Sequence, residues 1–378
     1  IVVVGWQVFE ITRDPLSLGM IGLAEALPFI GVSLYAGHVA DRLPRRPIAL
    51  AGTAGMLLSA IALLVFTLSG MIARGRVWPI YLVIFLSGIT RSFTRPAFTA
   101  LSAEVIARDI YVNAVAWRSS TWQLAAVVGP AAGGLVYGFA GAAAAYAGVS
   151  VLMVLAVLAL GLVTHDARPQ VREEVPIGES LRVGIRFIWR QPVLLAAMTL
   201  DLFSVLFGGA VALLPIFARL LGAGPQGLGL LRAAPAAGSL VTGVFVAHRP
   251  PMKRAGPALF AAVSIFGVTM IAFALSRNFF LSLALLTISG MADNVSVIIR
   301  GTLLQTMTPQ DLLGRVSSVN QVFIGASNEI GAFESGVAAK LMGTVPSVIF
   351  GGAMTLVVVV ITLWRSPQLR RMRQIPAA

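Results

Sequence analysis

The chain has 378 residues, of which 57% are hydrophobic and only 11% charged, and its mean hydropathy is +0.89. A soluble protein of this size could not bury so much apolar surface, because soluble domains are about 25% charged and their surface shrinks slowly with size. Lipid must therefore surround much of the chain, and the absence of cysteine excludes disulfides and thiolate chemistry.

Membrane-spanning helices are the main predicted elements, since about 20 apolar residues cross the hydrocarbon core of a bilayer. Residues 1–12 give only about two thirds of a crossing, and we expect them to be the outer part of a first span that begins upstream. Eleven full spans follow, at residues 16–37, 47–69, 78–98, 112–138, 142–163, 192–218, 225–247, 256–276, 279–302, 314–340 and 345–364. The pattern predicts an all-α membrane protein with twelve spans, the first of them truncated.

Basic residues are distributed unevenly between the two sides of the predicted bundle. If both termini are cytoplasmic, the inner loops hold 19 of the 28 basic residues, Arg300 among them, and the outer loops hold 6. This bias is the one that the positive-inside rule describes. It predicts a multi-pass protein of the cell (inner or plasma) membrane with both termini in the cytoplasm. It also explains the net charge of +13 without nucleic acid as a partner.

A polar stretch divides the predicted spans into two groups of six. We predict an N-terminal half at residues 1–163, a cytoplasmic linker at 164–191, a C-terminal half at 192–364 and a basic cytoplasmic tail at 365–378. Within the linker, residues 178–190 alternate apolar and basic side chains at helical spacing. That pattern is typical of a short helix on the inner membrane surface.

The two halves carry a weak internal repeat. An offset of 207 residues aligns Pro28 with Pro235, and an offset of 202 aligns Gly88 with Gly290. The same offsets align further pairs: Gly22 with Gly229, Gly31 with Gly238, Gly129 with Gly331 and Gly134 with Gly336. These matches, in register at corresponding spans, predict two parallel six-helix repeats. Transporters of this architecture rock their halves about a central site.

Charged residues inside the predicted spans are candidates for function, because ionisable groups are costly in lipid. The acids are Glu25, Asp201, Asp293, Glu329 and Glu334, and the bases are Arg91, Arg118 and Arg232. The two offsets align Glu25 with Arg232 and Arg91 with Asp293, so opposite charges occupy equivalent positions twice. We expect these four residues and Asp201 to serve proton coupling or substrate binding. The alternative is structural ion pairing within each half.

The turn between the second and third predicted spans, "GHVADRLPRRP", resembles the loop signature of the major facilitator superfamily. "VVGPAAGG", at 127–134, resembles the fifth-span signature of that family's antiporters. "SGITRSFTRPAFTAL" and "LLQTMTPQDLLGRVSSVNQ" are similar to its drug/siderophore (enterobactin-type) exporter branch. The resemblance covers nearly the whole chain and implies the major facilitator fold.

A cytoplasmic gate is the role that the loop signature implies. Asp41 is expected to pair with Arg95 and to face the positive end of the eleventh span, which would close the inner side. For the basic pair that follows, a solvated turn is an equal alternative, since the positive-inside rule alone favours arginine there. The predicted gate set is Gly37, Asp41, Arg42, Arg45, Arg46 and Arg95.

The fifth-span signature predicts a bent and closely packed helix. Gly129 and Pro130 are expected to kink it, because proline removes one helical hydrogen bond. Gly133 and Gly134 are expected to allow a neighbouring helix to approach closely.

The function that fits these features is secondary active export of a small organic molecule (drug, siderophore or metabolite) by alternating access, with proton antiport. An enzyme is not expected, because no phosphate-binding P-loop and no "GxSxG" or "HExxH" motif is present. No cofactor and no metal is expected; the expected partners are a small-molecule substrate, protons and the lipid bilayer, with the protein a monomer. An importer or a non-transporting sensor of the same fold is the alternative.

Overall fold

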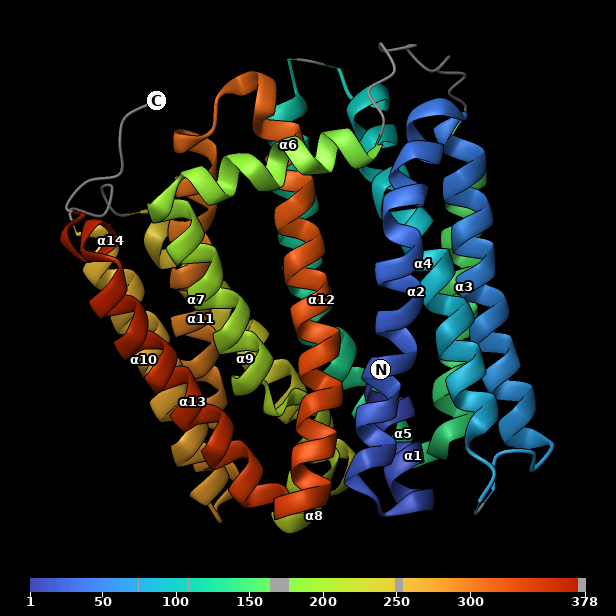
Figure 1. Cartoon of the computed structure of the whole chain (residues 1–378). Coiled ribbons are helices and arrows are strands. Elements are labelled where there is room, and N and C mark those ends of the chain that lie inside the picture. The colour runs from blue at the N-terminus through green and yellow to red at the C-terminus, as the bar shows by residue number, and fades with distance from the viewer. Residues whose placement is uncertain (74, 108, 164–176, 249–253, 373–378) are drawn as a thin grey trace.

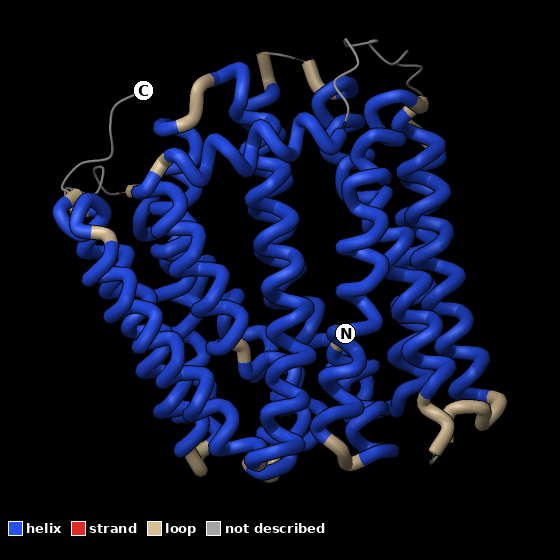
Figure 2. The backbone as a smooth tube through the Cα atoms, viewed as in Figure 1, coloured by secondary structure: helices blue, strands red, loops and turns tan. Residues whose placement is uncertain are grey.

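Helices account for almost all of the chain that the computed structural model describes, namely residues 1–73, 75–107, 109–163, 177–248 and 254–372. The only β-structure in these ranges is an isolated bridge between Ala73 and Arg76. Figure 2 shows the helices running roughly parallel, joined by short turns. Side chains at positions 33, 34, 37, 38, 40–42, 112, 177 and 180 lie outside the described part.

The helices before the linker form an N-terminal group. They are α1 (Val2–Thr12), α2 (Pro15–Arg42), α3 (Arg45–Leu68), α4 (Trp78–Val105) and α5 (Tyr111–Gly161). Proline stands in the first turn of α2 and of α4, where its missing N–H costs no hydrogen bond. Asp14 caps α2, since its carboxylate accepts a hydrogen bond from the Ser17 backbone at 3.1 Å.

The remaining helices follow the linker. They are α6 (Ile177–Arg190), α7 (Pro192–Gly208), the short 3₁₀ helix η1 (Ala210–Leu213), α8 (Leu214–Leu220), α9 (Gly224–Ala247), α10 (Ala255–Leu275), α11 (Phe279–Met307), α12 (Gln310–Met342), α13 (Thr344–Arg365) and α14 (Pro367–Arg371). Helices α7 to α13 make up a C-terminal group. The predicted span at 192–218 is broken in the structure, where η1 separates α7 from α8.

Eight helices in the described ranges are long and apolar enough to cross a membrane. One of them is α5, which comprises two crossings because Gly141, with φ 79° and ψ 178°, breaks the helix. Only glycine adopts that backbone readily. Helices α4 and α12 have the length to cross but carry more polar residues. With these two, the described chain contains the eleven full crossings that the sequence predicts, and α1 is the partial one.

The predicted repeat is visible in matching contacts within the two groups. Gly88 on α4 packs against Pro28 on α2, where an added Cβ would lie 2.6 Å from the proline ring. Their repeat equivalents, Gly290 on α11 and Pro235 on α9, are also in direct contact. Two residue pairs aligned only by sequence offsets therefore make equivalent contacts, which supports the duplicated architecture.

Two helix pairs make the most extensive contacts between the groups: α2 with α12, and α5 with α9. A Cβ on Gly336 would lie 2.6 Å from the Cα of Gly19, and one on Gly134 would lie 2.7 Å from the Cα of Gly229. The repeat offset of 202 residues aligns Gly134 with Gly336, and the fifth-span signature predicts the close packing at Gly134. Because only glycine tolerates such an approach, the two groups are held tightly together at this level.

The close contacts lie toward one end of the bundle, and α6 lies across the other. Figure 1 shows α2 and α12 converging at the end opposite α6 and separating toward the α6 end. Helix α6 packs on α12, where Gly184 approaches the backbone of Arg315. Its apolar face, including the buried Ile188, faces the bundle, and Arg182 and Arg186 are exposed. The predicted helix at 178–190 corresponds to α6.

Candidate substrate and coupling site

Glu25 and Arg91 form an ion pair that links α2 to α4. The carboxylate side chain is 11% exposed, and the guanidinium side chain is 45% exposed. The two residues lie about 15 Å and about 20 Å of helix rise from the starts of α2 and α4, close to the middle of a bilayer. This ion pair therefore lies within the N-terminal group.

A charged side chain of the C-terminal group interacts with this ion pair. Glu329 on α12 interacts electrostatically with both Arg91 and Arg232. Arg232 on α9 donates a hydrogen bond of 3.4 Å to the backbone oxygen of Val211. Glu329 thus lies within electrostatic reach of a guanidinium group from each group of helices. The four charged residues form what we call the central cluster: Glu25, Arg91, Arg232 and Glu329.

The central cluster lies next to the contacts that join the two groups. An added Cβ on Gly22, one turn before Glu25 on α2, would lie 2.8 Å from the backbone oxygen of Glu329. On the side toward α6, Phe29 contacts Gly325 of α12. A change in the angle between α2 and α12 would therefore change the surroundings of Glu25 directly.

A second group of charges lies within the C-terminal group. Asp201 on α7 pairs with Arg300 on α11, and both side chains are at most 10% exposed. Arg300 also donates a hydrogen bond to the hydroxyl of Ser296 at 3.2 Å. Asp293 lies two turns before Arg300 on α11 and interacts electrostatically with Asp201 and Arg300. This cluster holds two carboxylates and one guanidinium group.

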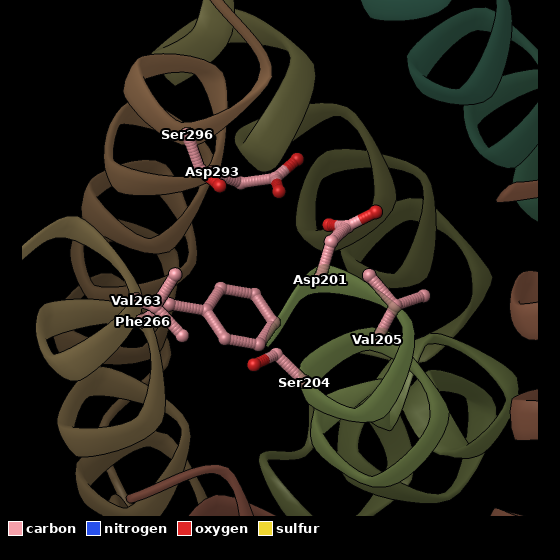
Figure 3. A pocket seen from close by; sticks show the side chains of 7 residues that line it. All are labelled: Asp201, Ser204, Val205, Val263, Phe266, Asp293 and Ser296. Atoms are coloured by element: carbon pink, nitrogen blue, oxygen red, sulfur yellow. The ribbon is translucent and has the colours of Figure 1, made fainter. Parts of the chain in front are cut away.

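Asp201 and Asp293 border a small pocket between α7, α10 and α11. Figure 3 shows their carboxyl groups on the same side of the pocket, with the ring of Phe266 across from them. The other lining residues are Ser204, Val205, Val263 and Ser296. The pocket therefore combines two acids with hydroxyl and apolar groups. Such a site suits a proton or a small cation better than an anion.

At the α6 end, the residues of the predicted gate have partners of their own. Arg45 pairs with Glu104, so the start of α3 is tied to the end of α4. Arg46 donates a hydrogen bond of 2.7 Å to the backbone oxygen of Gly161 at the end of α5. Both arginines therefore contact other helices of the N-terminal group.

The rest of the predicted gate is only partly described. The side chains of Gly37, Asp41 and Arg42 lie outside the described part of the chain, and so does the expected pairing of Asp41 with Arg95. The guanidinium group of Arg95 lies 6.0 Å from the ring centre of Trp122 on α5, within the range of a cation–π contact.

Two partner residues were missed by sequence reasoning. Arg300 was assigned to an inner loop, which is wrong: α11 continues to Met307 and buries Arg300. Its spacing of two helical turns from Asp293 is the signal that could have identified it. Glu104 is an acidic residue at the predicted cytoplasmic side, where the positive-inside rule favours basic residues. The same argument singled out Asp41.

The predicted kink residues lie inside α5 without breaking it. Pro130 is within the helix, and the non-helical residue is Gly141. The backbone oxygen of Pro130 would lie 2.6 Å from a Cβ on Gly229, so this part of α5 is in direct contact with α9. Gly129 has open space beside it.

The two groups are also joined by an ion pair at the end opposite α6. Lys340 in the last turn of α12 lies 2.6 Å from the carboxylate of Asp14, the cap of α2. Burial raises the pKa of Asp14, but hydrogen bonds from Lys340 and Ser17 outweigh it and lower the pKa overall. A lowered pKa means that the pair stabilises this contact fully above the ordinary value of 3.8, and loses that effect as the pH falls below it.

Replacing Lys340 by Ala should loosen this end of the bundle. An exposed ion pair is worth about 0.2–1 kcal/mol, so the ratio of closed to open molecules should fall by up to about fivefold near neutral pH. Because the chain has no cysteine, spin labels at Leu68→Cys and Leu341→Cys can report the distance between the groups. Lys340→Arg should keep the closed distance, and an unchanged distance distribution in Lys340→Ala would disprove the role of the pair.

Known proteins resemble this chain over nearly its whole length. A family model described as a transmembrane secretion effector matches residues 1–377. The enterobactin exporter EntS of Escherichia coli O1:K1 / APEC is 28% identical over 383 residues, which cover 98% of this chain and 88% of that protein. The enterobactin exporter EntS of Shigella flexneri is 27% identical over 381 residues, with the same coverage.

Solved structures share the fold at much lower identity. The peptide transporter POT in complex with sulfate aligns with a TM-score of 0.68 and 14% identity, covering 95% of this chain and 87% of that chain. A mutant of the same transporter with sulfate aligns with a TM-score of 0.69, also at 14% identity and with the same coverage. At this identity the likeness extends to the fold alone.

Proposed function

This chain belongs to the transmembrane secretion effector family of the major facilitator superfamily, and from that premise we propose that it exports a small organic molecule by alternating access in exchange for protons. It is a multi-span membrane transporter, and its relatives are transporters rather than enzymes. The superfamily predicted from the loop signature is therefore confirmed. The direction of transport, its coupling to protons and the identity of the substrate are parts of the proposal.

We place the α6 end in the cytoplasm and the protein in the cell membrane, as a monomer with both termini inside. The excess of arginine at this end supports the orientation. With that orientation the glycine contacts and the Asp14–Lys340 pair close the outer end, whereas α2 and α12 separate toward the inner end (Figure 1). A substrate from the cytoplasm would then reach the central cluster before the closed outer end.

The observation that carries the proposal is the position of the central cluster. Its acids lie on α2 and α12, the helices that join the two groups, and its arginines lie on α4 and α9. Rocking of the groups would separate or rejoin these charges and change their hydration. A transporter needs such a set, since its binding site must alternate between the two sides.

Proton coupling has two candidate locations. Glu25 is one, because its pairing with Arg91 lies beside the moving interface. The other is the cluster of Asp201, Asp293 and Arg300, which holds one carboxylate more than it holds cations. A proton that binds from one side and leaves on the other would balance that excess.

We assign the gate at the cytoplasmic end to the loop between α2 and α3. Asp41 would face the start of α12 when this end closes, and Arg95 would move from Trp122 to pair with it. The pairs of Arg45 with Glu104 and of Arg46 with Gly161 lie within the N-terminal group, so they can persist through the whole cycle. They hold the loop in place, and Asp41 makes the contact that opens and closes.

Proteoliposomes containing the purified protein test the proposal. With an imposed pH gradient, a siderophore such as enterobactin or a fluorescent drug should accumulate only in vesicles that contain the protein, and dissipating the gradient should stop it. Enterobactin is the first probe because the relatives are enterobactin exporters. Binding without transport would favour a sensor, and accumulation that moves in the same direction as protons would favour an importer.

A further inference from the structure

A basic pocket lies where α14 folds back against the start of α10. It is lined by Arg254, Pro257, Arg370 and Arg371. Arg254 immediately precedes the first residue of α10, and the other two arginines lie in the last turn of α14. All three guanidinium side chains are exposed. The pocket shares no lining residue with the pocket of Asp201 and Asp293.

The fold holds α14 firmly in this position. Leu369, between the helix start and the two arginines, is fully buried in a cluster with Leu259 and Val263 of α10. The backbone N–H of Gly256 donates a hydrogen bond of 3.2 Å to the oxygen of Met372. A Cβ at Gly256 would collide with the carbonyl of Leu369. Close backbone packing therefore keeps the arginines of α14 beside Arg254.

The charge of the pocket is not balanced by its own lining. Among the residues that the structure describes, no acidic residue lines it and no ion pair involves its arginines. Three guanidinium groups so close together repel one another, and an anion between them would relieve the repulsion. Arginine presents paired N–H donors in a plane, a geometry that matches phosphate oxygens.

The location of the pocket in the protein indicates which kind of anion can reach it. Helix α10 begins and α13 ends beside this pocket, so it lies at the membrane surface at the α6 end. The last two turns of α13 expose Val360, Ile361 and Trp364, the last of them 86% exposed. Tryptophan at this depth is typical of the boundary between headgroups and acyl chains. Lipid chains can therefore lie against α13 while the headgroup reaches the arginines.

We propose that this pocket binds the phosphate of an anionic phospholipid headgroup, such as that of phosphatidylglycerol. Basic pockets at the membrane surface between spanning helices are known lipid sites. A bound headgroup would join α14 to the start of α10 and so fix the end of α13. The site is separate from substrate transport, and its occupancy does not depend on which molecule is exported.

Native mass spectrometry of the purified protein with added phosphatidylglycerol, phosphatidylcholine or inorganic phosphate tests the site. Phosphatidylglycerol should bind and phosphatidylcholine should not displace it. Each arginine contributes about fivefold in affinity at a membrane surface, so the triple variant Arg254→Gln, Arg370→Gln, Arg371→Gln should bind roughly a hundredfold more weakly. The single variant Arg370→Gln, with a loss of about fivefold, carries the test if the triple variant is unstable.

The matched control removes the same charge from the same side of the protein. Arg182→Gln, Arg186→Gln, Arg190→Gln takes three exposed arginines from the surface of α6. This control should keep the high-affinity lipid. An equal loss in the control would mean unspecific attraction and would overturn the proposal. So would displacement of phosphatidylglycerol by equimolar inorganic phosphate, which would identify a soluble anion as the ligand.

Discussion

Replacing Arg300 by Gln should destabilise the folded protein by about 3–5 kcal/mol, since removing one partner of a buried ion pair leaves a buried charge uncompensated. Asp201 would lose its cation, and its side chain is only 9% exposed. Asp293, beside it in the same pocket, would then add a second carboxylate without a partner. Thermal unfolding in detergent measures the loss, as a lower midpoint and a lower yield of monodisperse protein.

A second substitution separates lost pairing from lost packing. In Asp201→Asn, Arg300→Gln, the charge of Asp201 no longer needs a partner and only Asp293 keeps an uncompensated carboxylate, so part of the lost stability should return. Arg91→Gln is the matched control: it also breaks an ion pair inside the bundle, but the Arg91 side chain is 45% exposed against 10% for Arg300, so solvent screens this pair more. We expect a smaller loss there. A double variant as unstable as Arg300→Gln would mean that Arg300 acts through its packing.

The spans could be predicted from the sequence because the thickness of lipid sets their length. Predicted and observed boundaries of α3 differ by a residue or two, at 47–69 and Arg45–Leu68. Helices α2, α4 and α11 extend further than predicted at the α6 end, because polar residues can continue a helix into the headgroup region. Hydropathy marks where lipid ends and not where a helix ends.

Partners inside the bundle could not be predicted from hydropathy alone. Asp201 and Arg300 are far apart in the sequence, and their meeting depends on how α7 and α11 are rotated against each other. The repeat did predict contacts between helices, since Gly88 with Pro28 and Gly290 with Pro235 both hold. Small residues fix where two backbones meet, whereas long charged side chains can reach several neighbours.

The alignment of opposite charges by the repeat gave a different result from the alignment of glycines. Glu25 aligns with Arg232, yet in the structure Glu25 pairs with Arg91 of its own group. Glu329, which the repeat did not single out, is the acid that interacts with Arg232. Residues aligned by the repeat therefore occupy equivalent places in the two halves but pair with different partners. This is expected, because the charges at the aligned positions differ between the halves.

Glu25→Gln should abolish pH-driven accumulation of substrate while leaving substrate exchange across the membrane intact. Glutamine resembles a permanently protonated carboxyl group, so the variant can still bind substrate and rock but can no longer load and release a proton. Pro28 frees the backbone oxygen of Ala24 beside this side chain, and a freed carbonyl favours water there. Gly22 and Phe29, on either side, contact α12. Hydration of Glu25 should therefore change each time the groups rock.

Reconstituted vesicles decide between coupling and structure for this residue. Accumulation under an imposed pH gradient and exchange of labelled substrate at equal pH are measured on the same preparations. Glu334→Gln, the same substitution further along α12 toward the outer end, should keep both activities. If Glu25→Gln loses exchange as well, the carboxylate is needed to hold Arg91 in place. If it still accumulates substrate against the gradient, Glu25 is only the partner of Arg91. Coupling then passes to the pocket of Asp201 and Asp293, where neutralising either acid should abolish accumulation.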